Sequence, residues 1–454
     1  MVKEIKVALI GAGSLTFTPS LLKGLALSPL SGDCELTVAL MDIDKRILDI
    51  MYKVGTKLVE HLKSKKNAWG FKVESYCERK PALEAADFVV VTVGVGGVKA
   101  THLDVEIPKS KGILQAIGDT VGPGGIVRAF RHTPLLLELA RDVEDVCPSA
   151  HVFNYSNPLT PLVRVVGRES KVKCYGLCTG PYAVKPALAA CFQVACEDIQ
   201  LYMGGINHLL WIKDFSVGGE RGYPLLENGA ESGETRGNLI DPVISELYRV
   251  FGILPAIGLG RHVAEFFPNI FMQPGAVEKY KIALFPEGTI YDYRNREPLE
   301  SVLANIASGT IPIDALLNRR GLEEEGIGVV RLMEALALDK RVFCPGINVL
   351  NEGIISNLPS WGVVEVSAYV DSTGVHPFSI GSLPKGVAAV LSSRLEQYEL
   401  TVDAALLCDK SLAMQSLLLD GYVRSIDLAK GLLDEMLNAE KEWLPSGWFE
   451  GGGV

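Results

Sequence analysis

The sequence predicts an α/β protein that begins with a Rossmann-type, doubly wound parallel sheet and continues into a mixed α+β, mainly helical part. Two observations predict this class. The first third of the chain alternates short apolar runs with helical patterns, beginning with IKVALIG at residues 5–11. A glycine-rich turn, GAGS at residues 11–14, follows that first run directly and precedes a helical pattern.

The predicted elements of the first part follow in order along the chain. Apolar periodicity indicates a helix through SLLKGLAL, a strand at LTVALMD and a long helix through RILDIMYKVGTKLVEHL. Further strands are expected at residues 87–94, 151–156 and 173–178, with a crossover helix at 133–147.

After Gly204 the alternation weakens and longer helical patterns take over. They lie around residues 241–252, 320–339 and 386–440, with strands inserted between Gly362 and Ile380. We therefore expect a first domain at residues 1–203 and a second at 204–454, packed around one cleft.

Composition favours a globular protein that acts on a small molecule. Hydrophobic residues make up 48% of the chain and charged residues 22%, and the net charge of -10 is not gathered into blocks. We therefore expect neither nucleic acid nor a membrane as a partner. Charged residues interrupt every run that approaches the roughly 18 residues of a membrane span. The nine scattered cysteines suit a reducing, cytoplasmic location.

The GAGS turn predicts a dinucleotide site formed by Gly11, Gly13 and Ser14. Glycines there permit a tight turn and let the backbone approach a pyrophosphate at a helix N-terminus. The full fingerprint has a third glycine where this chain has Thr16. Asp42, at the end of the second strand, strengthens the prediction, because a carboxylate there accepts the ribose hydroxyls of NAD and repels the extra phosphate of NADP.

Two later strand ends are also predicted to contact the cofactor. Val93 and Gly94 lie in the glycine-rich turn after the strand at 87–94, and Asn154 and Asn157 follow the strand at 151–156. A plain loop is the alternative for the first pair. An Asn that only forms the turn before Pro158 is the alternative for the second.

Several longer strings point to one family. They are GDTVGPGGIVRAFRHTP (118–134), NYSNPLT (154–160), GLCTGP (176–181), GINHLLW (205–211) and RHVAEFFP (261–268). Together with GAGS, the chain resembles the NAD- and metal-dependent glycosidases of family four over essentially its whole length. SLPKGV at 382–387 is most similar to the alpha-galacturonidase branch. The resemblance implies a lactate/malate dehydrogenase-like fold, with NAD bound by residues 1–203 and substrate and metal by 204–454.

The resemblance also implies a redox-neutral route for breaking a glycosidic bond. NAD oxidises carbon 3 of the sugar, which acidifies the hydrogen on carbon 2. A base removes that proton, the aglycone leaves carbon 1, water adds, and the hydride returns to carbon 3. The usual pair of catalytic carboxylates is not required by this family.

Metal ligands are carried over from the family onto Cys178 and His208. Both lie at the ends of predicted strands, KCYGLC and the run into GINH, where a parallel sheet collects its ligands. The resemblance implies a divalent cation, with Mn expected, that stabilises negative charge on the oxygens of carbons 2 and 3. A buried thiol and a hydrogen-bonded core imidazole are the structural alternatives. Asp119 and Arg128 flank the GPGG turn and are expected to address the sugar, with an ordinary ion pair as the alternative.

The chain departs from the family at positions that matter for proton transfer. Thr179 follows the metal cysteine, where many members carry an ionisable or amide side chain. Gly260 precedes Arg261, where the galacturonidase-like pattern has an aspartate. His262 is therefore the first candidate for the base at carbon 2, because an imidazole titrates near neutral pH. Glu265 and a metal-bound hydroxide remain open, and a positioning role is the alternative for His262.

The predicted substrate is an acidic hexoside. Members that cleave 6-phosphorylated glycosides have an arginine where this chain has Gly94, so the phosphate lacks a bidentate partner. A uronide or a sulfonated sugar is preferred, with Arg261, Arg128 and Arg131 as sources of positive charge. A dehydrogenase that releases NADH is the main alternative, and an inactive sugar or NAD sensor is a third. The apolar C-terminal helices predict a homo-oligomer, a dimer or tetramer.

Overall fold

The structure is a computed structural model that describes residues 3–64, 70–231, 241–256, 258, 260–318 and 323–450. Its strands are β1 (Lys3–Ile10), β2 (Cys34–Met41), β3 (Lys72–Tyr76), β4 (Phe88–Val91), β5 (His151–Asn154), β6 (Lys173–Gly176), β7 (Ile199–Ile206), β8 (Leu209–Val217), β9 (Glu220–Arg221), β10 (Val342–Leu350), β11 (Val363–Asp371) and β12 (Gly374–Pro377).

Helices connect these strands, and three α-helices follow the last strand of the described chain. The α-helices, in chain order, are α1 (Phe17–Leu27), α2 (Pro29–Asp33), α3 (Lys45–Ser64), α4 (Arg79–Leu83), α5 (Gly97–Ser110), α6 (Gly122–Val146), α7 (Leu159–Glu169), α8 (Gly180–Phe192), α9 (Gly222–Glu231), α10 (Pro242–Phe251), α11 (Gly260–Glu265), α12 (Pro268–Phe271), α13 (Pro274–Lys279), α14 (Tyr293–Ser308), α15 (Asp314–Leu317), α16 (Glu323–Leu338), α17 (Lys385–Leu407), α18 (Lys410–Asp420) and α19 (Ile426–Ala439).

The described strands form one sheet in the order β3-β2-β1-β4-β5-β6-β10-β11-β7-β8-β9, with β12 beside β11. The six strands from β3 to β6 pair in parallel. This half has the order of a doubly wound dinucleotide-binding sheet, which collects ligands at the carboxyl ends of its strands. The predicted Rossmann-type fold is confirmed.

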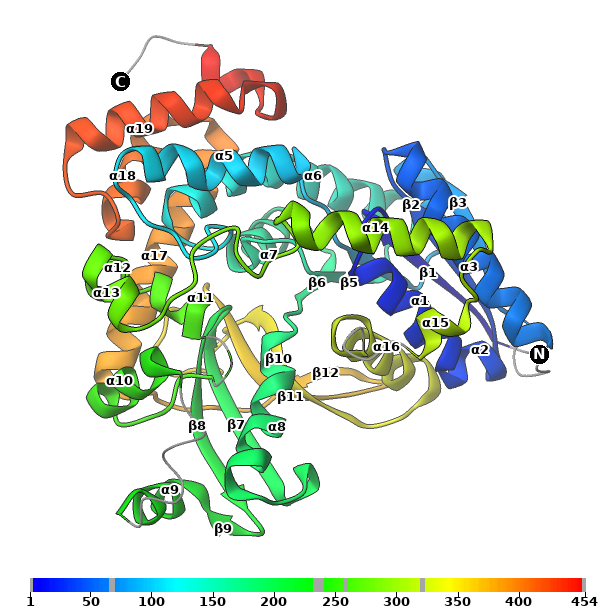
Figure 1. The fold of residues 1–454 in the computed structure, drawn as a ribbon, viewed down its shortest axis with the longest axis horizontal. Coiled ribbons are helices and arrows are strands. Elements are labelled where there is room, and N and C mark those ends of the chain that lie inside the picture. The colour runs from blue at the N-terminus through cyan, green and yellow to red at the C-terminus, as the bar shows by residue number, and fades with distance from the viewer. Residues whose placement is uncertain are drawn as a thin grey trace.

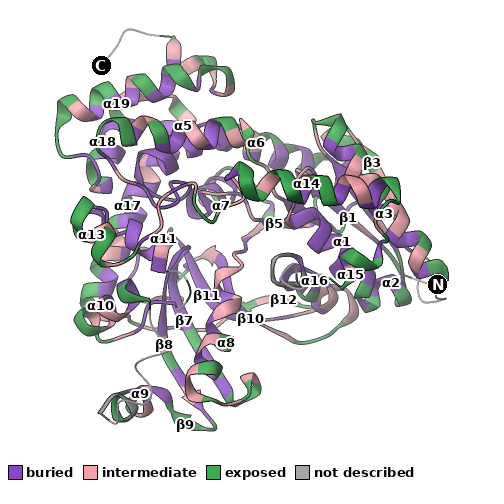
Figure 2. Ribbon diagram, in the orientation of Figure 1, coloured by how far each residue is buried: buried purple, intermediate pink, exposed green. Residues whose placement is uncertain are grey.

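Helices cover both faces of the parallel half. One face packs against α1, α3, α14 and α16, and the other against α4, α6 and α7. Strand β1 reads KEIKVALI, and its last four residues are all buried because both faces are covered. Figure 2 shows these inner strands as buried and the outward faces of the surrounding helices as exposed.

The second half of the sheet is antiparallel. Strand β10 pairs antiparallel with β6 and β11, and β11 with β7. Strands β7 and β8 form a hairpin whose residues pack in a core with α10, α11 and the C-terminal helices. In Figure 1 α17, α18 and α19 lie against α5 and α6, so the end of the chain returns to the first half.

Most predicted elements are found in the structure. The strands at 87–94, 151–156 and 173–178 are β4, β5 and β6, and the helix at 133–147 is the second half of α6. The part after residue 204 contains more strand than expected. Strand β10 escaped prediction because VFCPGINVL contains Pro and Gly, which a register shift between Cys344 and Ile347 accommodates.

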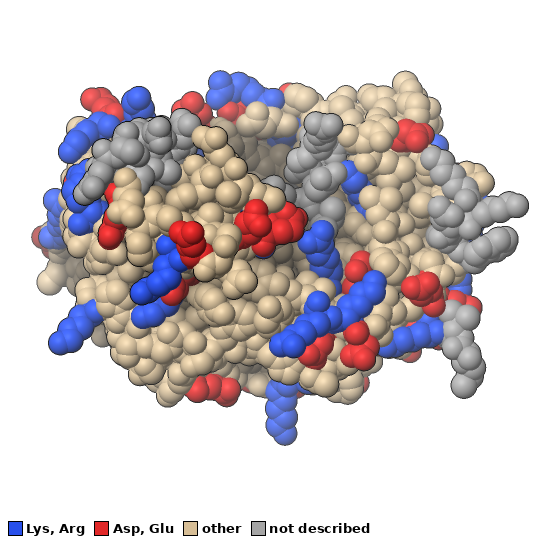
Figure 3. Space-filling view, turned by 90° about the horizontal axis from the view of Figure 1, so that it is seen from below, with Lys and Arg blue, Asp and Glu red and all other residues tan. Residues whose placement is uncertain are grey.

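Two further predictions concern the domain boundary and membrane-spanning helices. The expected boundary between residues 203 and 204 falls within β7 and stays a prediction. None of the described helices combines the length and apolar character needed to cross a membrane. Figure 3 shows acidic and basic side chains interspersed on the face seen from below, so the net charge of -10 is not concentrated there.

Candidate active site

The GAGS turn joins β1 to α1 at the carboxyl edge of the parallel sheet. Gly11 has a φ of +93°, and a Cβ there would lie 2.8 Å from the carbonyl carbon of Thr92. Its N–H and that of Ala12 each donate to the carbonyl of Met41 at 2.9 Å. A side chain at residue 11 would be strained and would collide with the end of β4, so the turn requires glycine.

Asp42 follows β2 directly and faces this turn. Its Oδ2 accepts the N–H of Gly13 at 2.6 Å, and its Oδ1 accepts the N–H of Asp44 at 2.9 Å. Ser14 Oγ accepts the N–H of Phe17 at 3.1 Å and so supports the first turn of α1. The carboxylate is thereby fixed one strand away from the glycine turn, where a ribose would lie in a dinucleotide-binding sheet.

The loop after β4 carries Val93 and Gly94 and is tied to its surroundings. Ser156 Oγ donates to the Val93 carbonyl at 2.9 Å, and Arg131 Nε donates to the Val95 carbonyl at 3.0 Å. A Cβ at Gly94 would find as its nearest neighbour an Nη of Arg128 at 3.9 Å. The absent side chain therefore leaves room beside that guanidinium.

His132 on α6 supports the same loop. Its Nδ1 donates to the Arg128 carbonyl at 2.8 Å, and its Nε2 accepts the N–H of Val95 at 3.1 Å. These partners fix one neutral tautomer. Burial, together with the charges of Arg128 and Arg131, lowers the pKa of His132 well below its ordinary value.

The glycines of GPGG bring α6 close to the loop that carries Asp119. A Cβ at Gly124 would lie 2.6 Å from the carbonyl oxygen of Gly118. A Cβ at Gly125 would lie 2.5 Å from the carbonyl carbon of Thr120. Side chains at either glycine would push the helix away from the loop, which explains why this string carries glycine there.

Asp119 is buried and hydrogen-bonded on both carboxylate oxygens. Asn157 Nδ2 donates to Oδ2 at 2.8 Å, and Thr120 Oγ1 donates to Oδ1 at 2.7 Å. The Thr120 hydroxyl also lies 2.8 Å from Nδ1 of His208. Because that hydroxyl has one proton and gives it to Asp119, His208 donates from Nδ1, and its Nε2 keeps a lone pair for another partner.

Asp119, His208 and His262 form the candidate metal cluster. One ligand atom of each lies within 4.8 Å of the others, and no other group of three His, Cys, Asp or Glu in the described part of the chain meets that criterion. The two imidazole centroids are 3.9 Å apart. His262 Nδ1 is buried without a hydrogen-bond partner. Three side chains of two types that bind divalent cations, carboxylate and imidazole, therefore converge on one point.

Both imidazoles are neutral near pH 7. Burial, with a smaller contribution from His262, lowers the pKa of His208 to about 3 against the opposing effect of Asp119. Burial also lowers the pKa of His262. Burial raises the pKa of Asp119, but His262, His208, Arg128 and the Thr120 hydroxyl outweigh that effect and lower it overall. The cluster thus presents one carboxylate and two neutral rings.

His208 reaches the cluster by a route that differs from the prediction. It was expected at the end of a strand in the parallel sheet, but β7 pairs antiparallel with β8 and β11, so that interpretation is wrong. His208 lies in the two-residue turn of the hairpin, with a φ of +65°. The hairpin carries its turn toward the edge of the sheet where Asp119 lies.

Cys178 lies between β6 and α8. Its Sγ accepts the N–H of Gly180 at 3.3 Å, in the first turn of that helix. Burial, with a smaller contribution from Glu365, raises the pKa of the thiol to about 12, while Gly180 and Asn207 oppose the increase. Asp119 also raises the pKa of this thiol, and the Cys178 sulfur is not within the 4.8 Å group.

Two predicted residues are occupied by protein partners. Asn154 is fully buried, and its side-chain amide bonds the N–H and the carbonyl of Ser156 in its own turn. Arg261 donates to the carbonyls of Ala116 and Glu287. Asn157, in contrast, meets Asp119 directly.

Sequence reasoning missed several polar residues around the cluster. Thr120 bridges Asp119 and His208, and Glu365 is fully buried on β11 beside Asn348, whose Nδ2 donates to it at 3.0 Å. Burial raises the pKa of Glu365 to about 7. A lone Glu within the apolar string VVEVSAYV is a signal that could have identified it, because an unpartnered carboxylate is costly in a buried strand.

The structure offers a substitute for the missing side chain at Gly260. A Cβ on this residue would lie 2.2 Å from Cγ of Asp241. The Asp241 carboxylate caps α10 by accepting the N–H of Val243 at 2.8 Å. An aspartate at 260 would therefore require the Asp241 side chain to move, and in this chain the Asp241 carboxylate packs on the start of α11 instead.

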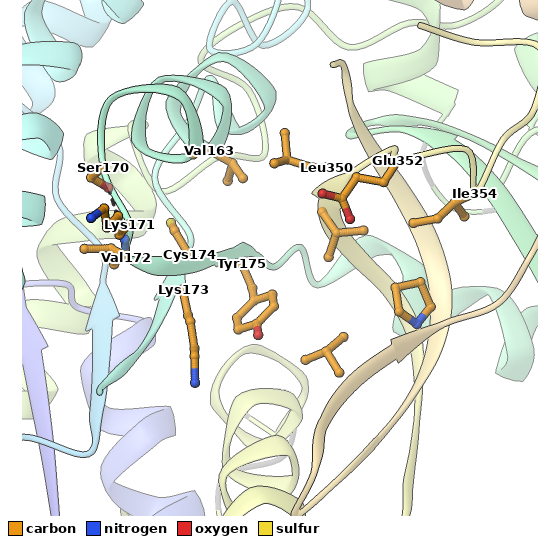
Figure 4. Close-up of a pocket in the computed structure, with 14 residues that line it drawn as sticks. Val163, Ser170, Lys171, Val172, Lys173, Cys174, Tyr175, Leu350, Glu352 and Ile354 are labelled. Carbon is orange, nitrogen blue, oxygen red and sulfur yellow. Dashed lines mark hydrogen bonds between the residues drawn. The ribbon is translucent and has the colours of Figure 1, made fainter. Parts of the chain in front are cut away.

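A separate hollow of about 620 Å³ lies at the opposite end of β6 from Cys178. Lys173, Cys174 and Tyr175 line it from β6, and Leu350 and Glu352 line it from the end of β10 and the residues that follow (Figure 4). It contains none of the predicted site residues. The hollow is therefore distinct from the candidate active site.

Comparison with known families agrees with this geometry. Residues 6–194 match the family 4 glycosyl hydrolase family, and residues 203–423 match the family 4 glycosyl hydrolase C-terminal domain. The chain belongs to family 4 of the glycosyl hydrolases. It is therefore a glycoside hydrolase, as the motif resemblance predicted.

Relatives of this family member span nearly its whole length. An alpha-galactosidase of Bacillus subtilis is 31% identical, with 97% of this chain and 99% of that protein covered. An alpha-galacturonidase of Thermoanaerobacter italicus is 32% identical, with 98% of each covered. A structure of the 6-phospho-beta glucosidase from Thermotoga maritima with manganese, NAD+ and glucose-6-phosphate has a TM-score of 0.79 at 25% identity, covering 97% of this chain and 99% of that one.

The His132 geometry predicts how this enzyme responds to acid. The folded pKa of His132 lies below its unfolded value of about 6.5, so the unfolded chain binds the extra proton first. Below that pH, stability falls by up to about 1.4 kcal/mol per pH unit from this residue, until the folded pKa is reached. His132→Gln keeps an acceptor for Val95 without titrating, so denaturant unfolding at pH 7 and pH 5 should show a smaller loss for the variant. An equal loss in both proteins would assign the acid sensitivity elsewhere.

Proposed function

We propose that this glycosyl hydrolase is an NAD-dependent glycosidase that cleaves an acidic hexoside, an alpha-galacturonide or a related uronide or sulfonated sugar. The convergence of Asp119, His208 and His262 is the observation that carries the proposal. Strands β1 and β4 also end at dinucleotide-type glycine turns in the same sheet, at Gly11 and Gly94. The relatives named alpha-galacturonidase support the substrate class.

The residues of the first half fit NAD. Gly11 leaves no space for a side chain next to β4, and Asp42 stands fixed one strand away with a carboxylate for two ribose hydroxyls. The 6-phospho-beta glucosidase of Thermotoga maritima, whose structure contains NAD+, has the same fold. When bound, NAD supplies the acceptor for the hydride of sugar carbon 3 and returns that hydride at the end of the cycle.

The residues of the cluster fit a divalent cation, with manganese proposed. His208 has a free Nε2 lone pair, and Asp119 is a buried carboxylate. We assign Cys178 and His208 as ligands, with Asp119 beside them, because this leaves His262 free for proton transfer. The cation supplies positive charge that stabilises the oxygens of sugar carbons 2 and 3.

His262 is proposed to remove the proton from carbon 2. Its ring is neutral, its Nδ1 is unpartnered, and Asp119 is close enough to stabilise the imidazolium that proton uptake creates. The proton then resides on His262 while the bond from carbon 1 to the aglycone oxygen breaks. Water adds as hydroxyl at carbon 1, a proton returns to carbon 2, and the third proton, of the one held by His262 and the two of water, ends on the aglycone oxygen, so the sum of the steps is hydrolysis.

Arg128 is the cationic group proposed to recognise the acidic substituent. Arg131 is fully buried and pairs with Asp104 and Glu440, and Arg261 is engaged with backbone carbonyls. Arg128 is also buried, with its Nε donating to the Asn157 carbonyl and its Nη1 donating to Thr101 Oγ1, but its Nη2 lies beside the space left at Gly94. An acidic group of the sugar that entered this space would meet the guanidinium.

The proposed reaction predicts a specific product balance. Aryl uronides incubated with enzyme, catalytic NAD and Mn²⁺ should release aglycone without accumulation of NADH, and the sugar formed in D₂O should carry deuterium at carbon 2. The reason is that the hydride returns to carbon 3 whereas the carbon 2 proton exchanges with solvent. NADH formed in step with substrate consumption would instead establish the alternative, a net dehydrogenase.

Ligand and base can be separated by substitution. Cys178→Ser and His208→Ala are expected to abolish turnover and weaken Mn²⁺ binding measured by electron paramagnetic resonance, with NAD affinity unchanged. His262→Gln is expected to abolish turnover and carbon 2 exchange but to retain Mn²⁺. Loss of Mn²⁺ in His262→Gln would make His262 a ligand and leave the base to be found.

Asp241 is the carboxylate that packs at the position of the missing side chain of Gly260. Asp241→Asn, which keeps the cap of α10, should remain active if His262 is the base.

Arg128 predicts charge selectivity. Arg128→Met should lower kcat/KM for a uronide by about 10- to 100-fold, the loss expected for a hydrogen bond to a charged group, while the neutral galactoside changes much less. Steady-state kinetics on the matched pair of aryl glycosides measures this ratio. An equal loss on both substrates would show that Arg128 does not read the charge.

A further inference from the structure

Two side chains of helix α11 hydrogen-bond to the backbone of the loop that leads into Asp119, one to a carbonyl and the other to N–H groups. We propose that Arg261 and Glu265 form a positioning pair that fixes residues 116–118 and thereby sets Asp119 against His262. The inference rests on the proposed function, because it gives the pair a role in metal binding. Neither side chain is assigned to contact the sugar.

Arg261 provides the first half of this contact. Its Nη2 and Nε donate to the Ala116 carbonyl at 2.7 and 3.2 Å, and its Nη1 donates to the Glu287 carbonyl at 2.7 Å. The guanidinium therefore bridges two loops and has three of its N–H groups engaged with backbone. This arrangement uses the planar fork of arginine, which lysine cannot reproduce.

Glu265 provides the second half, one helical turn further along. Its Oε1 accepts the N–H of Ile117 at 2.9 Å and that of Gly118 at 3.0 Å. The side chain is fully buried. Arg261 thus fixes a carbonyl of the segment while Glu265 fixes the next two amides, which leaves the peptide planes one orientation.

The held segment leads directly into Asp119. Gly118 has a φ of +75°, and a Cβ on it would lie 2.6 Å from Val105, so the chain makes a close turn immediately before the carboxylate. Gln115 holds the start of the segment by donating to the Asp104 carbonyl at 2.9 Å. Loss of the amide acceptor would release the turn that aims Asp119.

The same helix also carries His262. Arg261, His262 and Glu265 all belong to α11. The hydrogen bonds of Arg261 and Glu265 to residues 116–118 therefore determine the separation between His262 and Asp119. A pair that only stabilised the fold could lie anywhere in the core. This pair instead connects the two elements whose side chains must converge for the cluster to form.

Metal affinity and amide exchange of designed variants test the proposal. Glu265→Met keeps length and removes the acceptor, Glu265→Gln restores an oxygen, and Arg261→Met removes the fork while Arg261→Lys keeps only the charge. In the NAD-bound enzyme, Glu265→Met and Arg261→Met should weaken Mn²⁺ binding by at least about tenfold, the loss typical when support of a metal site is removed. Glu265→Gln should recover most of the affinity. Hydrogen exchange of residues 116–118 should accelerate in the same order.

Glu399→Met is the control, because it removes a carboxylate outside the cluster, the partly buried partner of Arg164 and Arg168 between α17 and α7. It should lower Tm and leave Mn²⁺ affinity unchanged. Faster exchange with unchanged Mn²⁺ affinity in both Met variants at α11 would overturn the positioning role. If Glu265→Met fails to fold, Arg261→Met decides by the same two measurements.

The failure of the two proposals is distinguishable. Wild-type enzyme that binds no Mn²⁺ would refute the metal site. Amide exchange of residues 116–118 would still show whether Arg261 and Glu265 hold that segment. Unchanged amide exchange at residues 116–118 in Glu265→Met would show that Glu265 does not fix this segment, whether or not the metal binds.

Discussion

The buried carboxylate of Asp119 is the interaction on which the site depends. A carboxylate withdrawn from water is costly unless hydrogen bonds and positive partners surround it. Asn157 and Thr120 supply the hydrogen bonds, and His208 and His262 complete the shell. These side chains come from the loop of Asp119 itself, the loop after β5, the β7–β8 turn and helix α11, so the need to satisfy one buried charge brings three loops and a helix to one point. The polar cluster is also the place where this fold departs from an apolar core, as functional sites commonly do.

Topology explains how those segments meet. A parallel sheet gathers the ends of β1, β2, β4 and β5 at one edge, which is where the glycine turns and Asp42 lie. The antiparallel addition brings a hairpin to the same region, and its turn delivers His208. Helix α6 begins with glycines so that it can approach the Asp119 loop without side chains between them. The parallel and antiparallel halves are therefore parts of one continuous sheet, and the C-terminal helices return to cover α5 and α6.

Much of this could be predicted from the sequence because the relevant signals are local. Apolar periodicity, GAGS and the position of Asp42 depend on neighbouring residues, and the fold class follows from them. The contacts of Asp119 with Thr120 and Asn157 could not be foreseen, because they depend on how separate loops pack. The same holds for Arg261, which was expected at the sugar and instead bonds backbone carbonyls. The strand with Pro and Gly in its centre was missed because breaker residues inside a register shift have the local signature of a loop.

The most direct test of the central claim is a crystal structure of the enzyme soaked with Mn²⁺ and NAD, with the metal located by anomalous scattering. The account predicts one strong peak within bonding distance of His208 and beside Asp119, facing the nicotinamide ring across a space large enough for a sugar. A metal peak bound elsewhere, or a nicotinamide ring that points away from His208 and His262, would contradict it.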